Sequence, residues 1–376
     1  MSLVDLLETG NVDTFSKARR NMEICNACRY CEGYCAVFPA MERRRLFSSG
    51  DLMHLSNLCH NCQGCYHACQ YAPPHEYGIN IPEVFSTIRV ETYKQYAWPN
   101  QLSIMFNKGG LIASIAVAVS IGLIIFLCLY FIQNDTFFGI HLNEGAFYKI
   151  VPYNIMVLVP SAISIFAILS ISISTKRFWN DVNQSNIKIK FSYIKTAIIE
   201  VLTLKHLSGG GHGCNDISDK FTQWRRFHHQ FTMYGFMLCF ASTSVATIYD
   251  HFLNLQAPYA YLSIPVLLGT IGGILLSIGS TGLLIIKWKS DPKPQAIKTL
   301  GLDYGFLFLL KGVAETGLLL LIFRETSAMG VLLAIHLGFV LALFLLLPYS
   351  KFVHGIYRFI ALIINASETQ KDHLTN

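Results

Sequence analysis

Eight of the eleven cysteines lie in one short stretch, from Cys25 to Cys69. They form two copies of the spacing C-x2-C-x2-C-x3-C, and in each copy a proline follows four positions after the last cysteine. This spacing is typical of [4Fe–4S] clusters, although the proline usually follows the fourth cysteine directly. Where two such motifs occur together, three cysteines of each ligate one cluster and the fourth ligates the other cluster. The pattern therefore predicts two clusters with crossed ligands.

The expected ligands of the first cluster are Cys25, Cys28, Cys31 and Cys69. The expected ligands of the second cluster are Cys59, Cys62, Cys65 and Cys35. Zinc usually takes two separated pairs of ligands rather than a triplet followed by a fourth residue. Disulfides form in oxidising compartments, and no secretory signal is recognisable, because the apolar stretch at residues 3–7 is short and is broken by Asp5. Zinc and disulfides are therefore the weaker interpretations.

The rest of the chain has the composition of a membrane domain. Of its 376 residues, 52% are hydrophobic and only 14% are charged, whereas about a quarter of the residues in soluble proteins are charged. The mean hydropathy is +0.42. A helix needs roughly 20 apolar residues to span a bilayer. The segments that meet this requirement are 109–132, 151–174, 227–249, 262–286, 304–323 and 326–347.

Basic residues in the connecting loops predict the orientation of these helices. Lysine and arginine are frequent between the second and third segments and after the fourth, whereas the opposite loops hold only Lys149 and Arg324. Because loops rich in lysine and arginine stay in the cytoplasm, we expect a multi-pass protein of the cytoplasmic membrane with its N-terminal head in the cytoplasm. The excess of 29 basic over 23 acidic residues is too small to indicate nucleic-acid binding.

These observations predict a mixed fold in three parts. Residues 1–100 are expected to form a small α+β head that resembles a two-cluster ferredoxin. Residues 101–350 are expected to form an all-α bundle of six transmembrane helices, and residues 351–376 a cytoplasmic tail.

Histidines in the third and sixth segments are candidate haem ligands, because polar residues inside the membrane are costly and usually functional. At about 100° per residue, His229 and His251 fall within about 40° of one helix face, whereas His228 and His251 lie about 140° apart. We therefore favour His229 over its neighbour. His336 and His354 are about five whole turns apart and would share a face of one helix.

The two segments are antiparallel, so His229 would pair with His354 near the cytoplasm, and His251 with His336 toward the outer side. Such pairs predict one or two b-type haems with imidazole ligands. The ligand separations along ideal helices, about 33 Å and 27 Å, agree only if a helix tilts or bends. Pro348 would either bend the sixth helix or disturb its phase. The alternative is that these histidines anchor helix ends at the membrane surface.

Three weaker features are also present. Lys311 and Glu315 lie one turn apart in the fifth segment and are expected to form an ion pair; contact with a haem propionate or a quinone is the alternative. The glycine-rich loop at residues 209–214 is expected to be flexible and to lie against the head or a partner. The arginines at 43–45 form either a docking patch or a solvated helix face.

Taken together, these motifs resemble those of the citrate utilization protein B family, also called tricarballylate utilization protein B. The resemblance covers nearly the whole chain. It rests on the doubled cysteine motif, Pro-Pro-His-Glu-Tyr at 73–77, Gly-Gly-Gly-His-Gly-Cys at 209–214 and Arg-Arg-Phe-His-His at 225–229.

The resemblance implies a redox subunit rather than a stand-alone catalyst. Such a protein would re-oxidise the reduced flavin of an FAD-dependent tricarballylate dehydrogenase through its two clusters and haem b, and deliver the electrons to membrane quinone. The residues themselves show no dinucleotide-binding fingerprint and no nucleophile–base arrangement, which agrees with this implication.

Two other functions stay open from the sequence. The first is a tricarboxylate transporter with a redox-sensing iron–sulfur head, although no convincing repeat of the kind found in transporters relates the six segments. The second is the membrane subunit of another oxidoreductase, of the heterodisulfide or glycolate type, which would use the same cofactors with a different partner.

Overall fold

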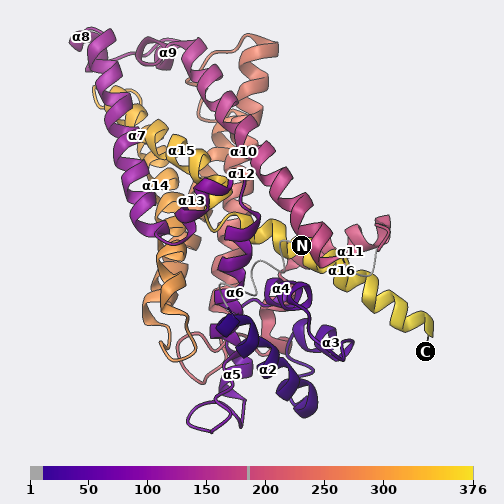
Figure 1. Ribbon diagram of the computed structural model, residues 1–376. Coiled ribbons are helices and arrows are strands. Elements are labelled where there is room, and N and C mark those ends of the chain that lie inside the picture. Colours follow the sequence, from indigo (N-terminus) through magenta and orange to yellow (C-terminus); the bar gives the residue numbers. More distant parts are fainter. Residues whose placement is uncertain (1–11, 184–186, 376) are drawn as a thin grey trace.

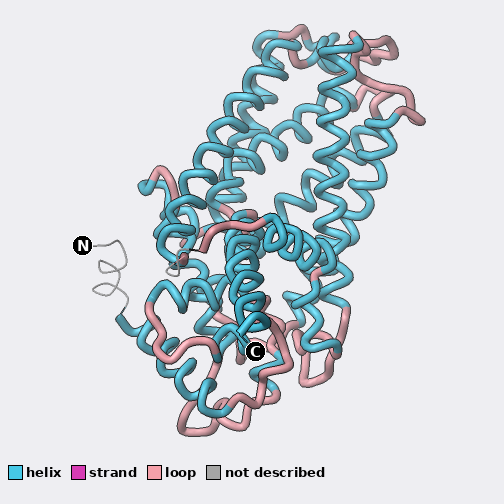
Figure 2. The backbone as a smooth tube through the Cα atoms, turned by 90° about the vertical axis from the view of Figure 1, so that its right-hand side faces the viewer, coloured by secondary structure: helices cyan, strands magenta, loops and turns pink. Residues whose placement is uncertain are grey.

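The computed structural model describes residues 12–183 and 187–375, and Figures 1 and 2 show that this part of the chain consists of helices and loops. A head of short helices lies at one end of a bundle of long helices (Figure 1). The helices of the head are α2 (Val12–Cys28), α3 (Val37–Glu42), α4 (Ser49–Leu58), α5 (Gly64–His67) and α6 (Ile81–Tyr96).

The predicted α+β head is wrong, because no strand occurs in residues 12–106. Helix α2 runs directly into the first cysteine motif and ends at Cys28. Two further helices begin at side-chain caps. The Ser48 hydroxyl accepts a hydrogen bond from the Asp51 N–H in a capping box that opens α4. The Asn80 side chain accepts one from the Glu83 N–H at the start of α6. The Ser48 cap thus favours a helix directly before the second cysteine motif.

Six described helices are long and apolar enough to cross a membrane, in agreement with the six predicted segments. They are α7 (Gly109–Phe131), α10 (Tyr153–Val182), α12 (Trp224–Leu253), α13 (Ile264–Lys289), α14 (Leu300–Phe323) and α15 (Met329–Leu346). The remaining elements are η1 (Asn100–Phe106), α8 (Asn134–Phe137), α9 (Ala146–Ile150), α11 (Phe191–Thr203), η2 (Lys205–Gly211), η3 (Ile297–Thr299), η4 (Leu347–Tyr349) and α16 (Val353–Thr375).

Close backbone contact joins α12 to α13. A Cβ atom added at Gly235 would lie 2.5 Å from the backbone nitrogen of Leu276, and one added at Gly279 would lie 2.5 Å from the backbone nitrogen of Thr232. Small residues permit such an approach between membrane helices. Helices α7, α14 and α15 pack together, and α13 also packs against α14. Helix α12 is thereby held chiefly by α13.

The chain breaks between α15 and α16, which corrects one expectation. Helix α15 ends at Leu346, Pro348 lies in the short helix η4, and α16 begins at Val353. His336 and His354 are therefore on separate helices, and the prediction that they share one helix face is wrong.

The C-terminal residues, expected to be a tail, form α16, which leaves the bundle and lies along the head (Figure 1). Two of the three consecutive arginines bind this helix. The Arg44 guanidinium donates to Glu368 at 2.8 Å and to Asp51 in α4 at 2.6 Å. The Arg43 Nε atom donates to Asp372 at 2.5 Å. These contacts fasten the head to the end of the membrane domain.

We predict that Arg44→Ala will loosen the head, because it leaves the Glu368 carboxylate, which is only 17% exposed, with only the longer ion pair to Arg43 at 3.9 Å. The expected loss of stability is roughly 3 kcal/mol, measured as a lower melting temperature of the purified protein in detergent. Arg45→Ala is the matched control, since Arg45 is exposed, and it should melt like the wild type. Equal melting temperatures for all three proteins would contradict this account of the junction.

Candidate metal centres

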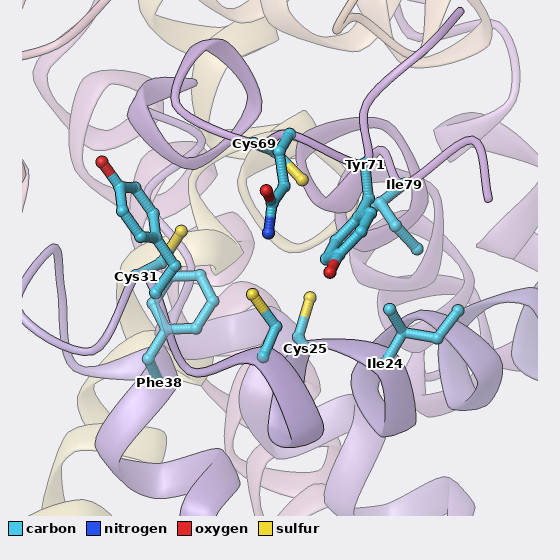
Figure 3. Close-up of a pocket in the computed structure, with 10 residues that line it drawn as sticks. Ile24, Cys25, Cys31, Phe38, Cys69, Tyr71 and Ile79 are labelled. Atoms are coloured by element: carbon cyan, nitrogen blue, oxygen red, sulfur yellow. The ribbon is translucent and has the colours of Figure 1, made fainter. Parts of the chain in front are cut away.

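The first candidate centre is a cavity at the surface of the head. It is lined by the cysteines Cys25, Cys28, Cys31 and Cys69. Figure 3 shows the sulfur atoms of Cys25, Cys31 and Cys69 pointing into one shared space. The last turns of α2 supply two of these residues, the following turn supplies the third, and the second motif supplies Cys69. Apolar side chains, among them Phe38 and Ile79, complete the walls.

The second candidate centre is an adjacent cavity in the head. Its cysteines are Cys35, Cys59, Cys62 and Cys65. Phe38 lines this cavity as well as the first, so one side chain forms part of the wall of both. Each cavity therefore combines three cysteines of one motif with the last cysteine of the other. These are the two sets of four that the spacing predicts, although their role as ligands stays a prediction.

The electrostatics of both cavities suit a cationic group with several sulfur ligands. Burial, together with the neighbouring thiols, raises the pKa of Cys25 and of Cys31 to about 12. Burial also raises the pKa of Cys35 and of Cys65 well above the usual range. Thiolates gathered in this way need a positive charge to stabilise them.

The cysteines are also spread too widely to share one ion. No three His, Cys, Asp or Glu side chains in residues 12–183 and 187–375 are grouped to hold a single metal ion. The thiols surround a shared space instead (Figure 3). The donor set therefore fits the multi-iron cluster that the spacing predicts.

The two cavities differ in their access to solvent. Tyr30 lines the first cavity and is 68% exposed. Cys59 and Cys62, which line the second cavity, are buried, whereas the four cysteines of the first are partly exposed. Gly210 of the loop after α11 has φ +70°, and a Cβ atom there would lie 2.7 Å from the Gly33 carbonyl oxygen. The glycine-rich loop therefore lies against the head, which was one of the two predicted locations.

Cys214 is a residue near the second cavity that the sequence did not identify. The loop is joined to the motif by a hydrogen bond of 2.9 Å, in which the Asn215 N–H donates to the Cys62 carbonyl. A hydrogen bond from the Cys214 side chain lowers the pKa of Cys62 to about 7. In the sequence Cys214 lies more than a hundred residues from the motifs, and only its glycine-rich neighbours mark it.

Two arginines hold the backbone of the second motif. Arg225, at the start of α12, donates to the carbonyls of Asn61 at 2.5 Å and His60 at 3.0 Å. Arg358, on α16, donates to the carbonyls of Cys59 at 2.7 Å and of residue 57 at 3.2 Å. Arg89 of α6 also donates to the Cys59 carbonyl. The ends of two long helices are thereby fastened to one loop of the head.

His229 lies one helical turn from Arg225 on the same face of α12, and His354 lies one turn from Arg358 on the same face of α16. Each histidine is on the membrane side of its arginine. Their ring centroids lie 6.1 Å apart, with the ring planes at 77°. An ion held by two imidazole nitrogens at about 2 Å each separates the ring centroids by roughly 6 Å. The Nδ1 atom of His354 donates to the Lys351 carbonyl, which leaves Nε2 for a metal. These two side chains could therefore hold one haem between them, which would accept and donate single electrons.

The other histidines named as haem candidates or their neighbours, His228, His251 and His336, do not form such a pair. The His228 ring stacks on Trp224 and lies against Gly282 of α13. His251, at the outer end of α12, contacts the hydroxyl of Tyr153 at 3.2 Å. His336 contacts Thr316 of α14 at 3.0 Å and lines a large cavity between the membrane helices.

The side chains that line this membrane cavity do not include His251, and among the described residues no second histidine lines it. The structure therefore brings together the predicted inner pair but gives His336 no imidazole partner in its cavity.

The ion pair predicted within the fifth segment is present. Lys311 donates to the Glu315 carboxylate. Two hydroxyl groups of α13 join the pair, since Lys311 also donates to Thr281 at 2.9 Å and Ser277 donates to Glu315 at 3.4 Å. These partners lower the cost of placing the charges within the membrane.

Comparison with known proteins gives one consistent result. The family model described as the citrate utilization protein B Fer4-like domain matches residues 18–105, and the model described as citrate utilization protein B matches residues 109–374. The chain is 45% identical over 357 residues to citrate utilization protein B of Escherichia coli, which covers 95% of this chain and 93% of the relative. No solved structure matches. The resemblance seen in the motifs is confirmed, and the chain belongs to the citrate utilization protein B family, with an iron–sulfur, Fer4-like domain at its N-terminus.

Proposed function

We propose that this protein takes electrons from the reduced flavin of a partner dehydrogenase acting on a tricarboxylate such as tricarballylate. The electrons pass through two [4Fe–4S] clusters and one b-type haem and reach membrane quinone. The observation that carries the proposal is the set of three sites: two adjacent cavities of the head, each lined by four cysteines, and the His229–His354 pair at the membrane end.

In this proposal the cysteines hold the clusters as two crossed sets. Cys25, Cys28, Cys31 and Cys69 hold the first, and Cys59, Cys62, Cys65 and Cys35 hold the second. Clusters and haem, when bound, accept and donate single electrons. The exposed Tyr30 beside the first cavity marks the side on which the flavoprotein docks.

The arginines near the second motif have an electrostatic as well as a structural role. Three guanidinium groups, those of Arg89, Arg225 and Arg358, donate to carbonyls of residues 56–61. The charge of Arg225 is offset by its ion pair with Asp216 at 2.7 Å. The charges of Arg89 and Arg358 are therefore the ones that stabilise the reduced, more negative form of a cluster in the second cavity. The second cluster is therefore the better electron acceptor, which favours transfer from the surface toward the membrane.

The head faces the cytoplasm in this proposal. The two basic loops lie on the head side of the bundle, since Asn80 of the head donates to the Lys293 carbonyl at 3.2 Å and Arg225 binds the second motif. Loops rich in lysine and arginine stay in the cytoplasm, where a soluble flavoprotein has access to the first cavity.

The proposal is tested by mixing an anaerobically reduced tricarballylate dehydrogenase with this protein in nanodiscs that contain quinone. We expect rapid flavin re-oxidation that depends on both quinone and this protein, and loss of that activity in Cys25→Ser while the membrane domain still inserts. A flavin that stays reduced beside fully loaded wild-type protein would contradict the proposed function.

The crossed arrangement makes a specific prediction for the fourth cysteine of each motif. Cys35→Ser and Cys62→Ser should remove the same electron paramagnetic resonance signal, because both residues are assigned to the second cluster. The signal of the first cluster should remain in both variants. In Cys69→Ser the signal shared with Cys25→Ser should disappear instead. If Cys35→Ser and Cys25→Ser removed the same signal, each motif would hold its own cluster and the crossed assignment would be wrong.

The histidine pair makes a prediction about haem. His229→Leu and His354→Leu should each reduce the haem b content of the purified protein at least tenfold, because each removes one axial ligand. His228→Leu is the matched control and should keep the wild-type content, because its ring lies against α13 rather than His354. Haem content is measured as the pyridine haemochrome. Equal haem in all three variants would show that the pair is not the site.

A further inference from the structure

We propose that the cavity between α12, α13, α14 and α15 binds the quinone that accepts the electrons. This inference deepens the proposed function and rests on it. The cavity has a volume of about 370 Å³, within the range of small-molecule sites. Its walls are mainly apolar and include Phe236, Phe240, Leu276, Val340 and Phe344. Such walls suit an aromatic ring with a hydrocarbon tail.

The cavity lies next to the histidine pair. Phe236, at its inner end, follows His229 by seven residues on α12, about 10 Å along the helix, and its ring packs 5.8 Å from that of Phe352, two residues before His354. From there the cavity extends to Tyr259 in the loop after α12. It is therefore the next large space beyond the inner pair on the path from the head.

The cavity opens toward lipid rather than toward the head. Phe240 and Thr243 of α12 line it and are exposed on the apolar surface of the bundle, Phe240 by 55%. Helix α12 packs chiefly against α13, so the cavity separates it from α15. A molecule dissolved in the bilayer can enter from this side, whereas a polar substrate would have to cross hydrocarbon.

Polar groups stand at two depths of the cavity. The Thr316 hydroxyl donates to the Gly312 carbonyl at 2.6 Å, so it accepts from Nδ1–H of His336 and leaves Nε2 to exchange a proton. At the outer end, Arg324 is 6% exposed and donates to the Tyr259 carbonyl at 2.6 Å. Its Nε atom is buried, lies 3.8 Å from the Glu325 carboxylate and makes no hydrogen bond to the described residues.

These groups match the two opposed oxygens of a quinone. Reduction of a quinone to the quinol takes two electrons, which arrive singly through this chain, and two protons, which come from water. A charged His336 ring donates a hydrogen bond to a quinone oxygen, and the neutral ring accepts one from the quinol hydroxyl. Arg324 supplies a donor for the second oxygen. A haem held by two imidazoles does not fit, because the lining side chains include only one histidine.

Binding of decyl-ubiquinone and of menadione to the oxidised protein in detergent tests the proposal by calorimetry, without flavoprotein or electron flow. We expect Ala246→Phe, which fills the cavity, and His336→Leu to weaken binding of at least one probe tenfold or more. Both variants should keep wild-type haem and iron. Ala118→Phe is the matched control, because Ala118 is exposed on α7, and it should bind like the wild type.

Two results would overturn the quinone site. One is wild-type affinity in Ala246→Phe, and the other is loss of haem in His336→Leu, which would make this a haem cavity. Because binding is measured without electron transfer, it also separates the two proposals. If quinone binding depends on the cavity but the flavin is not re-oxidised, the quinone site stands and the proposed function is wrong. If the flavin is re-oxidised but quinone binding does not depend on the cavity, the proposed function stands and the quinone site is wrong.

Discussion

The arrangement depends on the hydrogen bonds between two buried arginines and the backbone of residues 57–61. Arg225 begins α12, Arg358 lies on α16, and both donate to carbonyls around Cys59. A buried guanidinium needs acceptors, and the carbonyls of a tight loop need donors, so neither side is easily replaced. Because each arginine is one turn from a histidine, the same contacts set the separation between the second cysteine cavity and the His229–His354 pair.

Because of this constraint, the head and the inner ends of the membrane helices share one hydrophobic core. This core includes side chains from the inner end of α10, from α11 and from α16 as well as from the helices of the head. Arg44 adds ion pairs between α4 and α16. The loop carrying Gly210 and Cys214 lies against the head from a third direction. Both cavities are built mainly by the head, and His206 of η2 is the lining residue that the membrane domain adds to the second.

Features set by short-range spacing could be predicted from the sequence. The cysteine intervals gave both sets of four, because a tight loop leaves its three thiols little choice of direction. Long apolar runs identified the six membrane helices, and the four-residue interval identified the pair Lys311–Glu315. The helical phase of α12 favoured His229 over His228, and His229 is the one that faces His354.

Features that depend on tertiary contacts or on a break in the chain were missed. The helical head was misjudged because the ferredoxin spacing outweighed local signals such as the cap at Ser48. Pro348 ended a helix that phase reasoning treated as continuous. Cys214 and Arg358 lie more than a hundred residues from the second motif in the sequence, and no local sequence pattern predicts that they contact it.

The central claim is that one chain carries two clusters in crossed sets and a single haem at the histidine pair. Its most direct test is to measure iron, acid-labile sulfide and haem b on one anaerobically purified sample. The account predicts about eight non-haem irons, about eight sulfides and about one haem per chain. A preparation with intact clusters but no haem would contradict it, because His229 and His354 would then be structural and the path into the membrane would be lost.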